Sequence, residues 1–119
     1  MRVLIIDDDA LVLRAFARML RPHAVTAVKD ARAALDMVRA GNPFDAILCD
    51  LKMPHMSGRA FFAELEALEP ELADRVIFTS AGGSTRDEDV FLDGHPWLLK
   101  PFDARQLHRA LTPFVPPSA

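Results

Sequence analysis

The sequence predicts an α/β fold in which five strands alternate with five helices, a (βα)₅ arrangement. Short apolar runs recur along the chain, and segments with helical periodicity separate them. Strand and helix alternate throughout, which produces parallel strands, right-handed crossovers and helices on both faces of the sheet. We therefore expect a doubly wound, five-stranded parallel sheet in a single domain that covers residues 1–119.

The expected strands are short apolar runs bounded by polar or turn-forming residues. Such continuous runs are typical of strands that helices cover on both faces. The second run is diluted by Thr26 and Ala27, which places it at an edge of the sheet. In chain order the expected strands are residues 2–6, 24–28, 45–49, 75–79 and 97–99.

Capping residues mark the first two helices. Asp8 or Asp9 caps the first helix, which ends before Pro22. Asp30 caps the second helix, and Gly41 ends it in the manner of a C′ glycine.

The third and last helices carry similar signals. Ser57 opens the third helix, which is expected to end near Pro70. Asp103 and Gln106 form a pair like a capping box at the start of the last helix. The proline-containing tail 115–119 cannot continue that helix and is expected to be irregular.

The fourth helix is expected to be short or mobile. Residues 82–89 are polar and begin with two glycines, and only residues 90–92 are apolar before the turn at 94–96. A turn or two of helix is the most that fits here.

The composition excludes several classes of function. The net charge is −3 and no Lys/Arg cluster stands out, so binding to nucleic acid is not expected. No apolar run approaches the roughly 20 residues that span a bilayer, and the first residues do not have the pattern of a signal peptide. A lone Cys49, expected in the core, permits no internal disulfide and agrees with the cytoplasm. No helix-turn-helix follows Phe114, so direct gene regulation by this chain is not expected.

Polar side chains stand where the expected strands end. Asp7 and Asp8 follow the first strand, and Asp50 follows the third. Ligands of open parallel sheets bind outside the carboxyl ends of the strands, and gathered carboxylates require a cation. Mg²⁺ (or Mn²⁺) is the natural candidate for such a site. The alternative is that residues 7–9 merely cap a helix, which fits Asp9 but does not explain Asp7.

The position of Asp50 allows two interpretations. By itself it is a strand-end carboxylate bonded to a backbone amide. Beside a metal site and Lys100 it becomes a nucleophile that can accept a phosphoryl group as an aspartyl-phosphate. Ser80, or in second place Thr79, would then hydrogen-bond a phosphoryl oxygen.

Lys100 also has two readings. It is either a solvated lysine before a turn or the cation of the site. Pro101 allows a cis peptide bond, which could aim the ammonium group back over the carboxylates. The histidines show no ligand spacing and are expected on the surface: His23, His55, His95 and His108.

Together these residues resemble the receiver domain of two-component response regulators, from Val3 to about Phe114. The resemblance implies a flavodoxin-like sheet of order 2-1-3-4-5. It also implies that Asp50 takes a phosphoryl group from a phosphohistidine of a histidine kinase or a histidine phosphotransfer protein. The motifs that carry the resemblance are Asp7-Asp8, Asp50-x₃-Pro54-x₃-Gly58, Ser80-Ala81 and Lys100-Pro101-Phe102.

The resemblance further assigns the metal ligands and a switch. Mg²⁺ would be held by Asp8, Asp50 and the backbone carbonyl of Lys52, with Asp7 contributing through water. Ser80 and Trp97 would move together on phosphorylation, although the family usually has Tyr or Phe where this chain has Trp97. The chain is also similar to receivers attached to hybrid sensor histidine kinases, and it would signal to a downstream protein through contacts.

Two other functions compete with this interpretation. One is a phosphohydrolase of the haloacid dehalogenase kind, with Asp7 as nucleophile and Asp9 as acid/base. Two features argue against it: no cap domain is expected to enclose a substrate, and Leu11 stands where a small or Thr-like residue is expected. The other is a docking module that never carries phosphate.

Overall fold

Five parallel strands form one sheet in the order β2-β1-β3-β4-β5 in the computed structural model, which describes residues 1–117. The predicted topology is confirmed, with β2 at an edge. β3 and β4 each begin and end one residue later than expected, so Asp50 and Ser80 are the last residues of their strands. The strands are β1 (Arg2–Ile6), β2 (Ala24–Val28), β3 (Ala46–Asp50), β4 (Val76–Ser80) and β5 (Trp97–Leu99).

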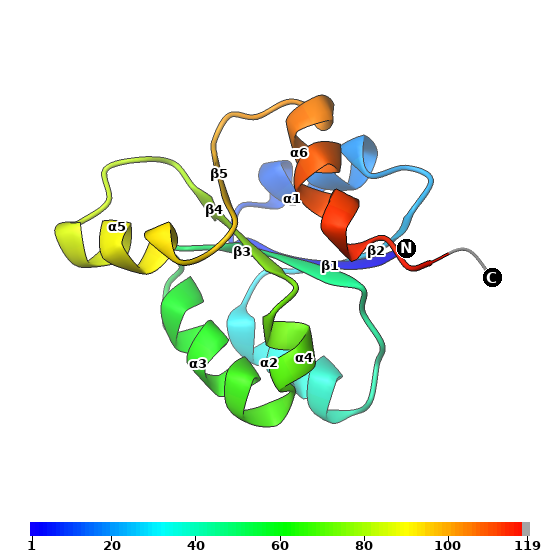
Figure 1. The fold of residues 1–119 in the computed structure, drawn as a ribbon, viewed down its shortest axis with the longest axis horizontal. Helices are drawn as coiled ribbons and strands as arrows, with labels where there is room; N and C mark the ends of the chain where they lie inside the picture. Colours follow the sequence, from blue (N-terminus) through cyan, green and yellow to red (C-terminus); the bar gives the residue numbers. More distant parts are fainter. Residues whose placement is uncertain (118–119) are drawn as a thin grey trace.

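Helices cover both faces of the sheet, as the alternation predicted. Figure 1 shows α1 and α6 above the sheet and α2, α3 and α4 below it, with α5 beside the edge that β5 forms. The helices are α1 (Ala10–Met19), α2 (Ala31–Arg39), α3 (Gly58–Leu68), α4 (Pro70–Ala73), α5 (Arg86–Asp93) and α6 (Ala104–Leu111), and α6 continues into a 3₁₀ turn over Thr112–Phe114.

The core consists of two apolar layers, one on each side of the sheet. Successive strand residues face opposite sides, so every central strand contributes to both layers. In β3, Leu48 packs in the layer with α1 and α6, whereas Cys49 packs in the layer with α2 and α3. Cys49 is therefore a core residue, as predicted.

The predicted caps are present. Asp9, and not Asp8, caps α1 by accepting from the Leu11 amide at 2.9 Å. Asp30 caps α2, and Gly41 follows that helix with a φ of 88°.

Two helices differ from expectation. Pro70 does not only end a helix; it also occupies the first turn of α4, where its missing N–H costs nothing. α5 reaches the upper limit expected for it, because Thr85 and Glu88 form a capping box at its start. The Thr-x-x-Glu spacing is a recognised sequence signal for such a cap, and the sequence analysis missed it.

Two of the four histidines expected on the surface, His23 and His95, are partly buried. His95 lies in the turn that joins α5 to β5, and its ring centroid is 4.4 Å from that of Phe91 and 4.7 Å from that of Phe62. Packing against aromatic rings, which ligand spacing does not reveal, accounts for this position. His55 and His108 are exposed as expected.

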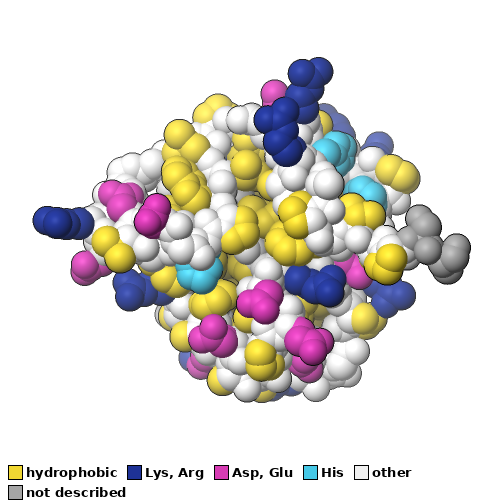
Figure 2. All heavy atoms as spheres, viewed as in Figure 1, with side chains coloured by type: hydrophobic (Ala, Val, Ile, Leu, Met, Phe, Trp, Pro, Cys, Tyr) yellow, Lys and Arg dark blue, Asp and Glu magenta, His cyan; other side chains and the backbone are white. Residues whose placement is uncertain are grey.

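The composition predicted no cluster of Lys and Arg side chains. On the face in Figure 2 the Lys and Arg side chains lie in separate places among acidic and apolar ones. Within residues 1–117, none of the helices has both the length and the apolar character needed to cross a bilayer. Residues 115–117 lie outside any helix or strand, whereas residues 118–119 of the predicted irregular tail lie outside the described part.

Candidate functional site

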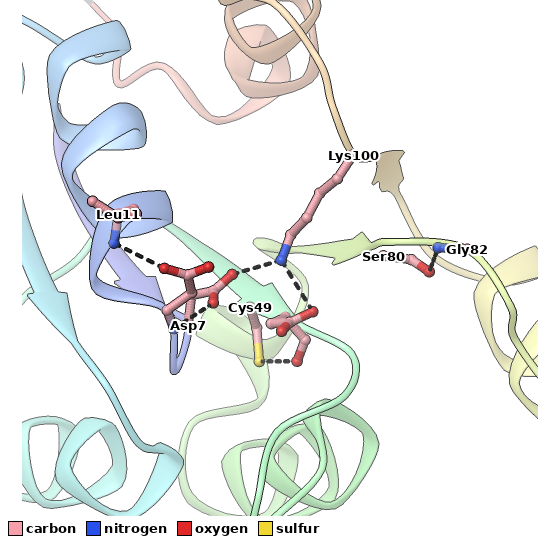
Figure 3. A network of polar contacts seen from close by, with 8 residues as sticks. Asp7, Leu11, Cys49, Ser80, Gly82 and Lys100 are labelled. Carbon is pink, nitrogen blue, oxygen red and sulfur yellow. Dashed lines mark hydrogen bonds and ion pairs between the residues drawn. The ribbon is translucent and has the colours of Figure 1, made fainter.

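The polar residues at the strand ends converge on one site. Asp7 follows β1, Asp50 ends β3, and Lys100 follows β5. Figure 3 shows the Lys100 side chain extended from its own segment down to the carboxylates beside the start of α1. The sheet order brings together residues that lie 43 to 93 positions apart in the chain, a juxtaposition that no local signal produces.

Three carboxylates form a candidate cation site. One oxygen from each of Asp7, Asp8 and Asp50 lies within 4.8 Å of the other two. Asp7 and Asp50 are buried, whereas Asp8 is exposed. Buried like charges at this separation repel one another unless a cation compensates them. Their oxygen atoms suit a hard divalent ion such as Mg²⁺, with the exposed side left for water and a phosphate oxygen.

Lys100 supplies one positive charge to this cluster. Its Nζ lies 2.7 Å from Asp7 Oδ2 and 3.5 Å from Asp50 Oδ1. Its backbone amide donates to the Ser80 carbonyl at 2.7 Å, and the Lys100–Pro101 peptide bond is cis. The alternative of a solvated lysine is wrong.

The environment shifts the pKa of both partners. Burial raises the pKa of Asp50; the charge of Lys100 opposes this and the charge of Asp7 adds to it. Burial by itself lowers the pKa of Lys100, but the hydrogen bond to Asp7 and the charges of both carboxylates outweigh it, so the pKa is raised. Lys100 therefore stays charged, and Asp50 pays a cost for its charge that a bound cation would relieve.

Asp7 makes contacts both within the site and within the turn that follows β1. Its Oδ1 accepts from the Asp9 amide at 2.9 Å, while its Oδ2 binds Lys100. The structure thus separates the roles of neighbouring acids: Asp9 caps α1, and Asp7 faces the lysine. The helix-capping alternative holds for Asp9 alone.

The two hydroxyl groups of β4 differ. Ser80 Oγ accepts from the Gly82 amide at 3.2 Å, and Figure 3 shows this pair apart from the acids. Thr79 is 1% exposed, and its hydroxyl finds no hydrogen-bond partner among the described residues. Trp97 is 44% exposed on β5.

Two further residues shape the site. Gly58 lies so close to β3 that a Cβ there would overlap the backbone oxygen of Asp50. Lys52 donates through Nζ to the Gly83 carbonyl at 2.9 Å and lies 3.7 Å from Glu88, which ties the loop after Asp50 to the start of α5. Lys52 was expected to contribute only its backbone carbonyl, and the Thr85 capping signal could have pointed to Glu88.

Comparison with known proteins gives one consistent family. A family model described as "Response regulator receiver domain" matches residues 3–112. The chain is 37% identical over 112 residues to the two-component response regulator ORR26 of Oryza sativa subsp. japonica, covering 90% of this chain and 19% of that protein. It is 30% identical over 111 residues to the transcriptional regulatory protein ZraR of Escherichia coli (strain K12), covering 92% of this chain and 25% of that protein. The chain thus spans a quarter or less of the length of these two relatives.

Solved structures agree on the fold. The chemotaxis protein CheY4 of Vibrio cholerae superposes with a TM-score of 0.82 at 22% identity, over 96% of this chain and 98% of that chain. A response regulator receiver domain protein from Clostridium thermocellum gives a TM-score of 0.82 at 24% identity, over 94% and 91% of the two chains.

Proposed function

Because the chain belongs to the response regulator receiver domains of two-component systems, we propose that it accepts a phosphoryl group on Asp50 and signals through protein contacts. The observation that carries this is the position of Lys100, whose ammonium group lies between Asp7 and Asp50 at the carboxyl end of the sheet. Phosphoryl transfer to a carboxylate requires a nucleophilic acid together with positive charge fixed beside it, and this site has two acids and a cation.

In the proposed reaction an Asp50 oxygen attacks phosphorus as the P–N bond of a phosphohistidine breaks. The imidazole leaves with the electron pair and is protonated from solvent. Lys100 and a hydroxyl of β4, with Ser80 the first candidate, bind the phosphoryl oxygens. Positioning and charge neutralisation supply most of the rate acceleration in such reactions.

A metal would be held on the exposed side of the same site. Asp8, Asp50 and the backbone carbonyl of Lys52 are the proposed direct ligands, with Asp7 contributing through water; the clustered carboxylates support this assignment. When bound, Mg²⁺ neutralises the charge of the carboxylates and the transferred group.

The proposed partners follow from this chemistry. A histidine kinase or a histidine phosphotransfer protein would supply the phosphoryl group, and a downstream protein would read the result. The domain itself acts as a single receiver unit that catalyses its own phosphorylation and slow dephosphorylation, and it does not turn over an external substrate. Trp97, exposed beside β4, is the proposed partner of Ser80 in the switch.

Mass spectrometry tests the proposal directly. The protein with Mg²⁺ and acetyl phosphate gains the mass of one phosphoryl group, and Asp50→Asn does not. Absence of any gain from small phosphodonors and from phosphorylated histidine kinases contradicts the proposal and favours a docking module.

The phosphohydrolase alternative predicts a different result. Its nucleophile, Asp7, is 1% exposed and is already bound by Lys100 and the Asp9 amide. Sustained hydrolysis of a phosphate ester, abolished by Asp7→Asn and kept by Asp50→Asn, is the outcome that would favour it.

A fluorescence titration tests the switch. Mg²⁺ followed by beryllium fluoride changes the emission of Trp97, which is the chain's single tryptophan, in the wild-type protein and not in Asp50→Asn. An unchanged emission despite mass-confirmed phosphorylation removes Trp97 from the proposed switch.

A further inference from the structure

Thr79 carries a polar group that the site described so far does not use. Its side chain is buried beside the end of β4, and its hydroxyl has no partner within residues 1–117. Buried hydroxyls in proteins are nearly always hydrogen-bonded, and valine would fill the same strand position without that requirement. A group that accepts a hydrogen bond from this hydroxyl when the site is occupied would satisfy it.

The strand register places Thr79 beside Asp50. The two residues are partners across β3 and β4, and the partner of Thr79 on its other side is Leu98. Because strand residues alternate between faces, Asp50 lies on the face of Leu48 and Thr79 lies on the face of Ile77. Leu48 and Ile77 belong to the same apolar layer, so Asp50 and Thr79 share one side of the sheet.

Lys100 closes the site above Thr79. β4 lies between β3 and β5, and the Lys100 backbone is bonded to Ser80 on β4. The Lys100 ammonium reaches Asp50 on β3 and Asp7 beyond it, so its side chain crosses the end of β4 (Figure 3). The Thr79 hydroxyl is therefore buried on the side of the sheet that carries Asp50, at the strand position next to it.

We propose that Thr79 is a positioning residue of this site, whose hydroxyl donates a hydrogen bond to the Asp50 carboxylate when the Lys100 ammonium turns toward an arriving phosphoryl oxygen. The inference rests on the proposed function. At rest the ammonium lies 3.5 Å from Asp50 Oδ1. Once it binds the phosphoryl group, the carboxylate loses this donor, and the adjacent hydroxyl replaces it. Thr79 keeps its proton throughout, while one P–O bond forms at Asp50 and the bond to the donor breaks.

The two hydroxyls of β4 then have separate tasks. Ser80 shares the face of Phe78, opposite to Thr79, and its oxygen is engaged by the Gly82 amide. Ser80 is the candidate for the phosphoryl oxygens, whereas Thr79 orients the nucleophile from within the sheet.

Two substitutions separate positioning from packing. Thr79→Val keeps the shape and the β-branch but removes the hydroxyl, and Thr79→Ser keeps the hydroxyl but removes a buried methyl. Three quantities are measured for each variant and the wild type: the rate of phosphorylation by acetyl phosphate, the Mg²⁺ dissociation constant from Trp97 fluorescence, and the thermal midpoint of the metal-free protein.

We expect the two variants to rank in opposite order by thermal stability and by phosphorylation rate. Thr79→Val has a midpoint equal to or above that of the wild type, yet phosphorylates about tenfold more slowly, the loss that one hydrogen bond to a charged group produces. Thr79→Ser has a lower midpoint but a rate close to wild type. The Mg²⁺ dissociation constant is unchanged in both.

Three outcomes overturn the inference. The first is wild-type phosphorylation by Thr79→Val, and the second is a fall in the rates of both variants that follows their midpoints. The third is a wild-type protein that takes up no phosphoryl group, which overturns the proposed function as well; the first two leave that function intact.

Discussion

At the scale of single residues, Asp50 combines burial with charge at a cost to stability. Burial raises its pKa, so the fold disfavours its ionised form at neutral pH. An uncharged isostere at this position removes the unfavourable burial of a charge.

Asp50→Asn is accordingly expected to raise the free energy of unfolding at pH 7 in the absence of metal. The folded pKa of Asp50 is raised above the unfolded value, so the wild type recovers stability as pH falls through the folded pKa. The gain of the variant over the wild type therefore shrinks on acidification. Urea unfolding of both proteins from pH 4 to pH 8 measures it, and a variant less stable than wild type across this range contradicts the expectation.

Lys100 titrates in the opposite range. Its folded pKa is raised, so the stability it contributes is fully present below the unfolded value of about 10.4 and is lost as pH rises through the folded pKa. The chain contains no tyrosine, which leaves few other groups to titrate there.

The variant Lys100→Met should be less stable than wild type from pH 7 to pH 10, because it leaves the Asp7 and Asp50 carboxylates without their cation. The difference in unfolding free energy narrows as the pH rises further. A difference that stays constant through pH 11 contradicts the role of the ammonium charge.

At the scale of elements, α3 is fixed against β3 by the absence of a side chain at its first residue. The Gly58 amide donates to the Leu51 carbonyl at 2.9 Å, and a Cβ at Gly58 would lie 3.0 Å from the Leu51 Cα. The helix start therefore packs directly on the backbone that carries Asp50.

Gly58→Ala is expected to cost about 1–3 kcal/mol of stability through overpacking, because the obstacle is backbone and cannot rotate away. Chemical denaturation measures the loss. Gly94→Ala is the matched control, since its Cβ would meet nothing closer than the Phe91 carbonyl at 3.9 Å, and it should change stability by about 0.5 kcal/mol or less. Equal effects of the two substitutions would refute the close-packing argument.

The elements also show where local signals suffice. Caps at Asp9, Asp30 and Asp103 are formed by contacts within three residues, so the sequence predicts them. The one-residue shifts of β3 and β4 are set instead by pairing with their neighbours, since strand ends are defined by hydrogen bonds to another strand.

At the scale of the whole molecule, the cation site links metal binding to folding. The three carboxylates come from two strand ends and meet only in the folded chain. A ligand that binds the folded state alone stabilises it by about 2.7 kcal/mol at a hundredfold excess over its dissociation constant.

Addition of Mg²⁺ should therefore raise the thermal midpoint in a concentration-dependent way, and removal with a chelator should reverse the change. Asp8→Asn, at an exposed ligand position, should lose most of the effect while remaining folded. Asp93→Asn, an exposed acid on α5, is the control with the same change in charge and should keep the full response. A midpoint that does not respond to Mg²⁺ in the wild type contradicts the metal site.

The sequence by itself determined the alternation of strand and helix, the caps and the chemical groups at the strand ends, because periodicity and capping act within a few residues. Only the tertiary structure decided that Lys100 lies between Asp7 and Asp50 and that His95 packs among phenylalanine rings. It also decided that the buried Thr79 hydroxyl has no partner among the described residues and lies on the strand next to Asp50. These relations depend on which strands are neighbours and which face each residue takes. They are fixed by long-range pairing and packing, and a local sequence pattern contains no information about these.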